Sequence, residues 1–118
     1  MEKNNMNIQI FGTKKSFDSK KAERYFKERG IKYQFVDMKE KGLSKGEFNS
    51  VCQAVGGYEK LIDSKCKDRN LLTLIQYLSE EDKMAKILEN QKIIRTPIVR
   101  NGKQATVGYE PDVWKNWN

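Results

Sequence analysis

The residues best suited to chemistry lie in two short basic segments, one around Ser16 and one around Cys66. In the first, Lys14, Lys15 and Lys20 crowd the expected start of a helix. Free backbone N–H groups and the helix dipole favour anions at such a position, so these lysines are candidates for holding an oxyanion. Solvated surface charge is the plainer role for the lysines, and helix N-capping is the plainer role for Ser16.

The second segment places Cys66 between Lys65 and Lys67. Neighbouring cations favour the nucleophilic thiolate, which makes Cys66 a candidate reactive or resolving thiol, although an ordinary exposed thiol is the simpler interpretation. The other cysteine, Cys52, falls on an apolar helical stripe and is expected in the core. Two cysteines are too few for a disulfide scaffold and fit a reducing compartment.

Composition narrows the classes of function further. The chain has 118 residues, the length of one domain (1–118), and it contains no histidine. The commonest general base and metal ligand is therefore missing, and no metal site is expected. The net charge of +7 fits an anionic ligand or partner, or solubility alone. No apolar run reaches the ~18 residues that span a bilayer, and the polar residues 1–7 do not resemble a signal peptide, so we expect a cytoplasmic protein with no membrane partner.

The spacing of apolar residues indicates which strands and helix flank the Ser16 segment. Alternating apolar residues predict strands at residues 8–11 and 31–37. Between them, Ala22, Tyr25 and Phe26 share one face of a helix that ends at Gly30. Such a unit is long enough for a parallel β-α-β crossover.

A block of helices follows. Ser44 and Glu47 form a capping-box pattern ahead of an apolar stripe, and Gly56-Gly57 ends that helix. Another helical turn is expected at residues 58–63. Two further helices are indicated by their apolar faces. The first face consists of Leu71, Leu74, Ile75 and Leu78. The second helix has a Ser79/Asp82 cap, and its face consists of Met84, Ile87 and Leu88.

The last part of the chain changes character. The run Thr96-Pro97-Ile98-Val99 opens a strand, Asn101-Gly102 is a strong hairpin signal, and residues 105–107 return antiparallel. A final helix is expected at about residues 112–117. The predicted fold is therefore α/β: a thioredoxin-like β-α-β unit and a β-hairpin-α unit, with a helical insertion between the two halves.

Four stretches together resemble the arsenate reductase (ArsC)/Spx family of the thioredoxin superfamily, and they cover nearly the whole chain in order. They are Ile10-Phe11-Gly12 followed by Ser16 and Lys20-Lys21-Ala22, then residues 57–63, then Ile94-Arg95-Thr96-Pro97-Ile98, and then Gly102 through Val107-Gly108-Tyr109 to Trp114.

The resemblance implies roles for particular residues. The family places a nucleophilic cysteine in the loop at the head of the first helix, and this chain has Ser16 there. The resemblance also implies that Arg95 and Lys65 help to hold an oxyanion, and that Thr96-Pro97 is a cis peptide bond beside that loop. A serine hydroxyl titrates far above neutral pH and no histidine is present to act as its base, so activity is expected to be impaired or absent.

The implied function is that of a thiol oxidoreductase of the glutaredoxin or arsenate reductase type. Its substrate would be a small oxyanion or a disulfide, with glutathione or glutaredoxin as external reductant and no bound cofactor. The serine could be natural, engineered in place of cysteine, or a replacement for selenocysteine.

The alternative is an Spx-like regulatory adaptor that binds a protein partner such as RNA polymerase without turnover, although the Cys-x-x-Cys of such members is absent here. Direct nucleic-acid binding is not expected, because Tyr25, Phe26, Tyr33 and Phe35 are expected in the core and leave no stacking platform.

Overall fold

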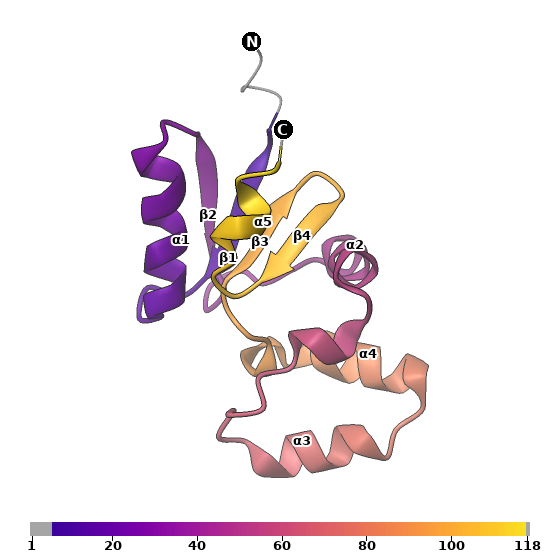
Figure 1. Ribbon diagram of the computed structural model, residues 1–118. Helices are drawn as coiled ribbons and strands as arrows, with labels where there is room; N and C mark the ends of the chain where they lie inside the picture. Colours follow the sequence, from indigo (N-terminus) through magenta and orange to yellow (C-terminus); the bar gives the residue numbers. More distant parts are fainter. Residues whose placement is uncertain (1–5, 118) are drawn as a thin grey trace.

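A four-stranded mixed sheet lies at the centre of the fold, as the computed structural model of residues 6–117 shows (Figure 1). Residues 1–5 and 118 lie outside the described part, and so does most of the polar N-terminal segment considered above. The strand order is β2-β1-β3-β4, with β1 parallel to β2 and antiparallel to β3. The strands are β1 (Ile8–Gly12), β2 (Tyr33–Asp37), β3 (Ile98–Asn101) and β4 (Gln104–Val107). The predicted β-α-β unit and hairpin are both confirmed.

Helix α1 (Phe17–Glu28) joins the two parallel strands. Its C-terminus is a Schellman motif: Gly30 takes a left-handed φ of +68°, and the N–H of Ile31 donates to Phe26 O at 2.9 Å. Because the helix end uses the N–H of Ile31, β2 begins at Tyr33, two residues later than the sequence indicated.

The helical insertion lies between β2 and β3. It comprises α2 (Lys45–Val55), the 3-10 turn η2 (Tyr58–Leu61), α3 (Arg69–Gln76), α4 (Glu80–Glu89) and the 3-10 turn η3 (Gln91–Ile93). The Ser44/Glu47 capping box is present, and Ser79 caps α4. Leu74 was expected to face inward but is 47% exposed, because α3 lies at the edge of the molecule and packs on α4 (Figure 1).

Helix α5 (Pro111–Trp114) is shorter than predicted. Beyond it the chain tightens into i→i+3 turns, in which the N–H of Trp117 donates to Trp114 O at 3.0 Å. Both tryptophans are nevertheless buried, and Trp114 Nε1 donates to Thr106 Oγ1 at 2.7 Å. The helix thereby fastens the hairpin to α1, whose Tyr25 and Phe26 rings contact the Trp114 ring.

Each face of the sheet has its own apolar core. On the face covered by α1 and α5, the core consists of Ile8, Ile10, Ala22, Tyr25, Phe26, Val99, Trp114 and Trp117. On the face covered by the insertion, it consists of Phe11, Leu43, Phe48, Val51, Cys52, Tyr58, Leu61, Ile75, Ile87, Ile93, Ile94 and Ile98. The alternation along β1 and β3 sends neighbouring residues to opposite cores.

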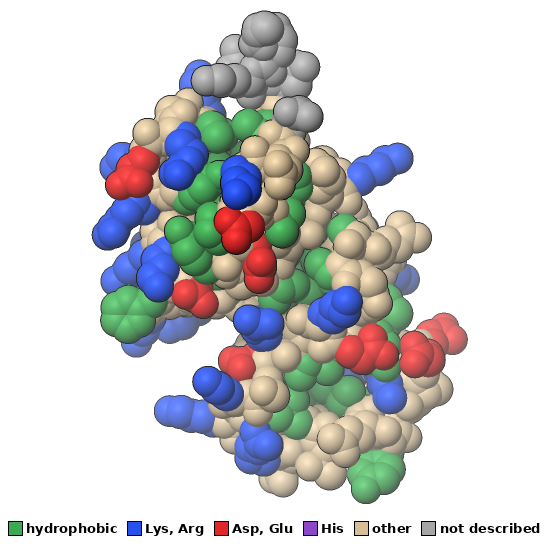
Figure 2. Space-filling model, viewed as in Figure 1, with side chains coloured by type: hydrophobic (Ala, Val, Ile, Leu, Met, Phe, Trp, Pro, Cys, Tyr) green, Lys and Arg blue, Asp and Glu red, His purple; other side chains and the backbone are tan. Residues whose placement is uncertain are grey.

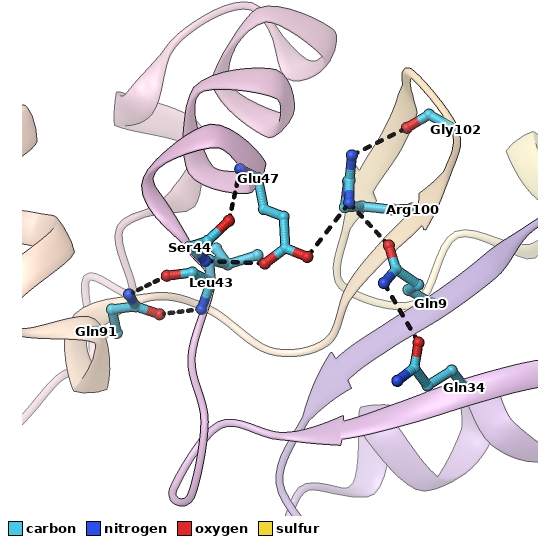
Figure 3. Close-up of polar contacts among 8 residues, drawn as sticks. All are labelled: Gln9, Gln34, Leu43, Ser44, Glu47, Gln91, Arg100 and Gly102. Carbon is cyan, nitrogen blue, oxygen red and sulfur yellow. Dashed lines mark hydrogen bonds and ion pairs between the residues drawn. The ribbon is translucent and has the colours of Figure 1, made fainter.

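A polar row crosses the insertion side of the sheet and holds the start of α2 (Figure 3). Arg100 Nη1 donates to Gln9 Oε1 at 2.8 Å, and Gln9 Nε2 donates to Gln34 Oε1 at 3.4 Å. The same guanidinium lies 3.8 Å from Glu47 Oε2, while Glu47 Oε1 accepts the N–H of Ser44 at 2.8 Å. One carboxylate therefore links the N-cap of α2 to the central strands.

Candidate functional site

Ser16 is the N-cap of α1, as the sequence predicted. Its φ and ψ of −80° and 124° are extended, and the N–H of Ser19 donates to Ser16 Oγ at 3.1 Å. The N–H of Ser16 donates to Thr13 O at 3.3 Å, and its carbonyl accepts the N–H of Lys20 at 3.1 Å. The side chain at position 16 thus points at the free N–H groups of a helix N-terminus, where a cysteine sulfur would be favoured as thiolate.

Ser19 is a residue of this site that the sequence analysis did not single out. It is 1% exposed, and its Oγ accepts the N–H of Thr13 at 3.2 Å. Gly12 permits this close approach, since a Cβ added there would lie 2.9 Å from Ser19 Cβ. The Ser16-x-x-Ser19 spacing matches that of a Cys-x-x-Cys motif, which is the signal that could have identified Ser19.

The Thr96–Pro97 peptide bond is cis, as the resemblance implied. Pro97 directly precedes β3, and the pairing of Phe11 with Ile98 brings it beside the end of β1. The carbonyl of Pro97 accepts the N–H of Gly108 at 2.8 Å, which ties this segment to the end of β4. The loop after β1 and the cis-proline therefore meet at one end of the sheet.

Arg95 and Lys65 line a cleft of about 780 Å³ between η2, β4 and the start of α5. The guanidinium of Arg95 lies over Gly108, whose φ is +83°; a Cβ added to this glycine would be 3.1 Å from Arg95 Nη2. Three cations and three carboxylates line the cleft: Lys60, Lys65 and Arg95, and Glu59, Asp63 and Glu110. Its charge is therefore mixed rather than purely positive.

The lysines of the loop form a separate group. Lys14, Lys15 and Lys20 are exposed, and the residues that line the cleft of Arg95 include none from residues 13–20. The lysines at the head of α1 and the Arg95–Lys65 cleft are thus two groups of cations, and the Thr96–Pro97 segment directly follows Arg95 in the chain.

The two cysteines differ in environment. Cys66 was expected to be exposed but is half-buried, because the N–H of Cys66 donates to Asp63 O at 3.0 Å and its side chain packs against the insertion core. Cys52 is a core residue, as predicted. Burial, together with the Glu59 carboxylate, raises the pKa of the Cys52 thiol to about 11, so this thiol stays protonated and unreactive at neutral pH.

Two further properties bear on the class of site. Within residues 6–117, no group of three or more Cys, Asp or Glu side chains is placed to hold a metal ion. In the same part of the chain, no helix combines the length and the apolar character needed to cross a membrane.

The sheet order, the cis-proline beside the end of β1 and the inserted helices define a thioredoxin-like protein. The sequence model of the ArsC family matches residues 11–117, and the chain belongs to that family.

Relatives agree with this assignment. The fold matches that of a putative ArsC family related protein from Bacteroides fragilis with a TM-score of 0.82, at 20% identity, over 95% of this chain and 98% of that one. It also matches arsenate reductase from Vibrio cholerae with a TM-score of 0.79, at 25% identity, over 92% and 94% of the two chains. The global transcriptional regulator Spx 2 of Oceanobacillus iheyensis is 27% identical over 109 residues, which are 91% of this chain and 80% of that protein.

Proposed function

We propose that this chain is an ArsC-family protein with the scaffold of a thiol oxidoreductase, in which Ser16 replaces the nucleophilic thiol and abolishes thiol-dependent turnover. The observation that carries the proposal is the position of Ser16 Oγ, which accepts the N–H of Ser19 at the head of α1. A cysteine there would gain a stabilised thiolate, whereas a serine gains only a helix cap.

Activation of the serine hydroxyl would require a general base. The chain has no histidine, and Asp18 is the single carboxylate among residues 13–20. Asp18 lies in the first turn of α1, and the Ser16 hydroxyl already accepts a backbone N–H. The Ser16 site therefore favours binding of a ligand over nucleophilic attack.

The ligand of this site is, in the same proposal, a small oxyanion or a disulfide compound. Lys14, Lys15 and Lys20 would attract it to the helix head, and backbone groups of Thr96-Pro97 would contact it there. The Arg95–Lys65 cleft would bind an adjoining charged group. In an active form of the protein, Cys66 or external glutathione or glutaredoxin would resolve the oxidised thiol. The proposal includes a cytoplasmic location, because thiols are kept reduced there.

A coupled arsenate reduction assay with glutathione and glutaredoxin tests the proposal. The wild-type protein is compared with Ser16→Cys, and Ser44→Cys is the matched control because Ser44 is also a helix N-cap serine. We expect turnover from Ser16→Cys alone. Adding Cys66→Ser to the Ser16→Cys protein then shows whether Cys66 or the external thiol resolves the intermediate.

Turnover by the wild-type protein would overturn the proposal that serine abolishes the reaction. Equal turnover from Ser16→Cys and Ser44→Cys would show that any thiol at a helix N-terminus suffices. That result would remove the argument for a preserved site at position 16.

A second candidate function is an Spx-like adaptor that binds a protein partner such as RNA polymerase without turnover. The 27% identity to a global transcriptional regulator favours it, and such a role needs no nucleophile. Size-exclusion chromatography with purified bacterial RNA polymerase tests it. Co-elution of the wild-type protein supports an adaptor, and complete separation at low salt contradicts it.

A further inference from the structure

The positive charge of the described chain is concentrated in its first third, which contains the β-α-β unit. Residues 6–41 contain ten Lys and Arg against five Asp and Glu, whereas residues 42–117 contain twelve against ten. Residues 14–29, which comprise α1 and its two flanks, hold seven Lys and Arg against three Asp and Glu and account for most of this excess. Figure 2 shows Lys and Arg side chains gathered over that side of the molecule. Such a local excess attracts a partner of opposite charge.

A groove of about 380 Å³ runs between α1 and the start of α5 within this basic region. Lys21, Arg24 and Arg29 line its α1 side, and Tyr109 and Pro111 line its α5 side. The groove therefore combines three cations with an apolar wall, and it contains no residue of the loop around Ser16.

Two of these cations are held in place by aromatic rings. The guanidinium carbon of Arg29 lies 3.8 Å from the centroid of the Tyr25 ring, and Arg29 Nη1 donates to Tyr25 O at 3.1 Å. Lys21 Nζ lies 5.7 Å from the centroid of the Tyr109 ring. Cations that are already ordered lose less side-chain entropy when they pair with an incoming carboxylate.

Neither ring offers a free face for base stacking, although Tyr109 is 39% exposed and part of it remains accessible to an apolar side chain. Tyr25 is 6% exposed beneath Arg29, and the Tyr109 ring meets the Trp114 ring edge-on at 5.5 Å while Lys21 lies over it. Glu28 also lines the groove among the cations, so a ligand there needs negative charges that are spaced apart rather than a continuous phosphate backbone. The charge pattern fits separated carboxylates better than a nucleic acid.

We propose that the groove between α1 and α5 binds an acidic protein segment. Carboxylates of the segment pair with Lys21, Arg24 and Arg29, and an apolar side chain between them packs against Tyr109 and Pro111. Electrostatic complementarity of this kind determines partner choice and association rate. The surface acts independently of chemistry at position 16.

Fluorescence anisotropy tests this surface with a labelled peptide in which Glu and Asp alternate with Leu and Phe, and with a labelled oligothymidine of equal charge. The wild-type protein is compared with Lys21→Glu/Arg24→Glu. The matched control, Lys45→Glu/Lys103→Glu, changes the net charge equally at exposed positions on α2 and in the β3–β4 turn. Arg29→Lys keeps the charge but removes the stacked guanidinium.

We expect the groove variant to bind the peptide at least ~10-fold more weakly and the control within ~2-fold of wild type. Arg29→Lys should fall between them, and added salt should weaken wild-type binding. Equal losses in the groove and control variants would overturn the proposal, as would no detectable peptide binding or tighter binding of oligothymidine. Melting curves of the variants show whether weaker binding comes from the altered groove or from loss of folding. Ser16→Cys should bind the peptide as wild type does, because the groove is separate from the proposed reductase site.

Discussion

Ser16 Oγ accepts the backbone N–H of Ser19 at 3.1 Å, and Ser19 Oγ in turn accepts the N–H of Thr13 at 3.2 Å. This pair of hydrogen bonds closes the loop between β1 and α1. Two hydroxyls with Cys-x-x-Cys spacing thus serve as structural acceptors, at a position where thiols would carry out redox chemistry. In the proposed function, this loop keeps the backbone arrangement of a reductase site and lacks its thiol.

Ser16→Ala should lower the free energy of unfolding by ~1 kcal/mol, because the N–H of Ser19 loses its acceptor. Ser16→Asp should recover most of this loss, since aspartate caps a helix and its charge suits the helix dipole. Urea denaturation measures both. An alanine variant as stable as wild type would show that the observed cap contributes nothing.

Cys52 should make stability depend on pH in the alkaline range. Burial raises its pKa to about 11, well above that of an ordinary thiol, so above about pH 9 the unfolded chain loses this proton before the folded protein does. Stability should therefore fall as pH rises from 9 to about 11, by up to ~2 kcal/mol, and this group should add no slope below that window.

Urea denaturation of wild type and Cys52→Ala across this pH range isolates the effect. Tyr33 adds a slope common to both proteins, because partial burial and then its hydrogen bond to Glu23 raise its pKa. The difference between the two proteins should shrink with rising pH. A constant difference would mean that the Cys52 thiol titrates normally.

Each carboxylate oxygen of Glu47 should make its own contribution to the free energy of unfolding. One accepts the N–H of Ser44, and the other lies 3.8 Å from the largely buried guanidinium of Arg100. Glu47→Gln can keep the cap while losing the ion pair, and Glu47→Ala loses both. We expect losses of ~1 and ~2 kcal/mol in the free energy of unfolding, and equal losses would contradict separate roles for the two oxygens.

The sequence predicted the features that depend on neighbouring residues. The Ser44/Glu47 capping box, the Asn101-Gly102 turn and the N-cap at Ser16 each follow from local backbone chemistry, and the structure confirms all three. The order of strands and helices followed from periodicity, and the family resemblance supplied the cis bond at Thr96–Pro97.

Features that depend on long-range register were not predictable in this way. Arg100 meets Gln9 across 91 positions in the sequence, and no local pattern marks that pair. The grouping of Arg95 with Lys65 likewise results from a long-range backbone bridge, in which the N–H of Arg95 donates to Leu61 O and the N–H of Asp63 donates to Ile93 O, each at 2.7 Å. Ser19 is buried because α1 packs closely against Gly12. No local sequence pattern predicts this close approach.

The most direct test of the central claim is a thiolate titration of the Ser16→Cys variant by ultraviolet absorbance, as a difference from wild type to remove Cys52 and Cys66. If the head of α1 is an intact thiol site that lacks only its sulfur, the new cysteine should titrate well below ~8.5, the value of an unperturbed thiol. A midpoint at or above that value would contradict the claim that this loop preserves the environment of a nucleophilic cysteine.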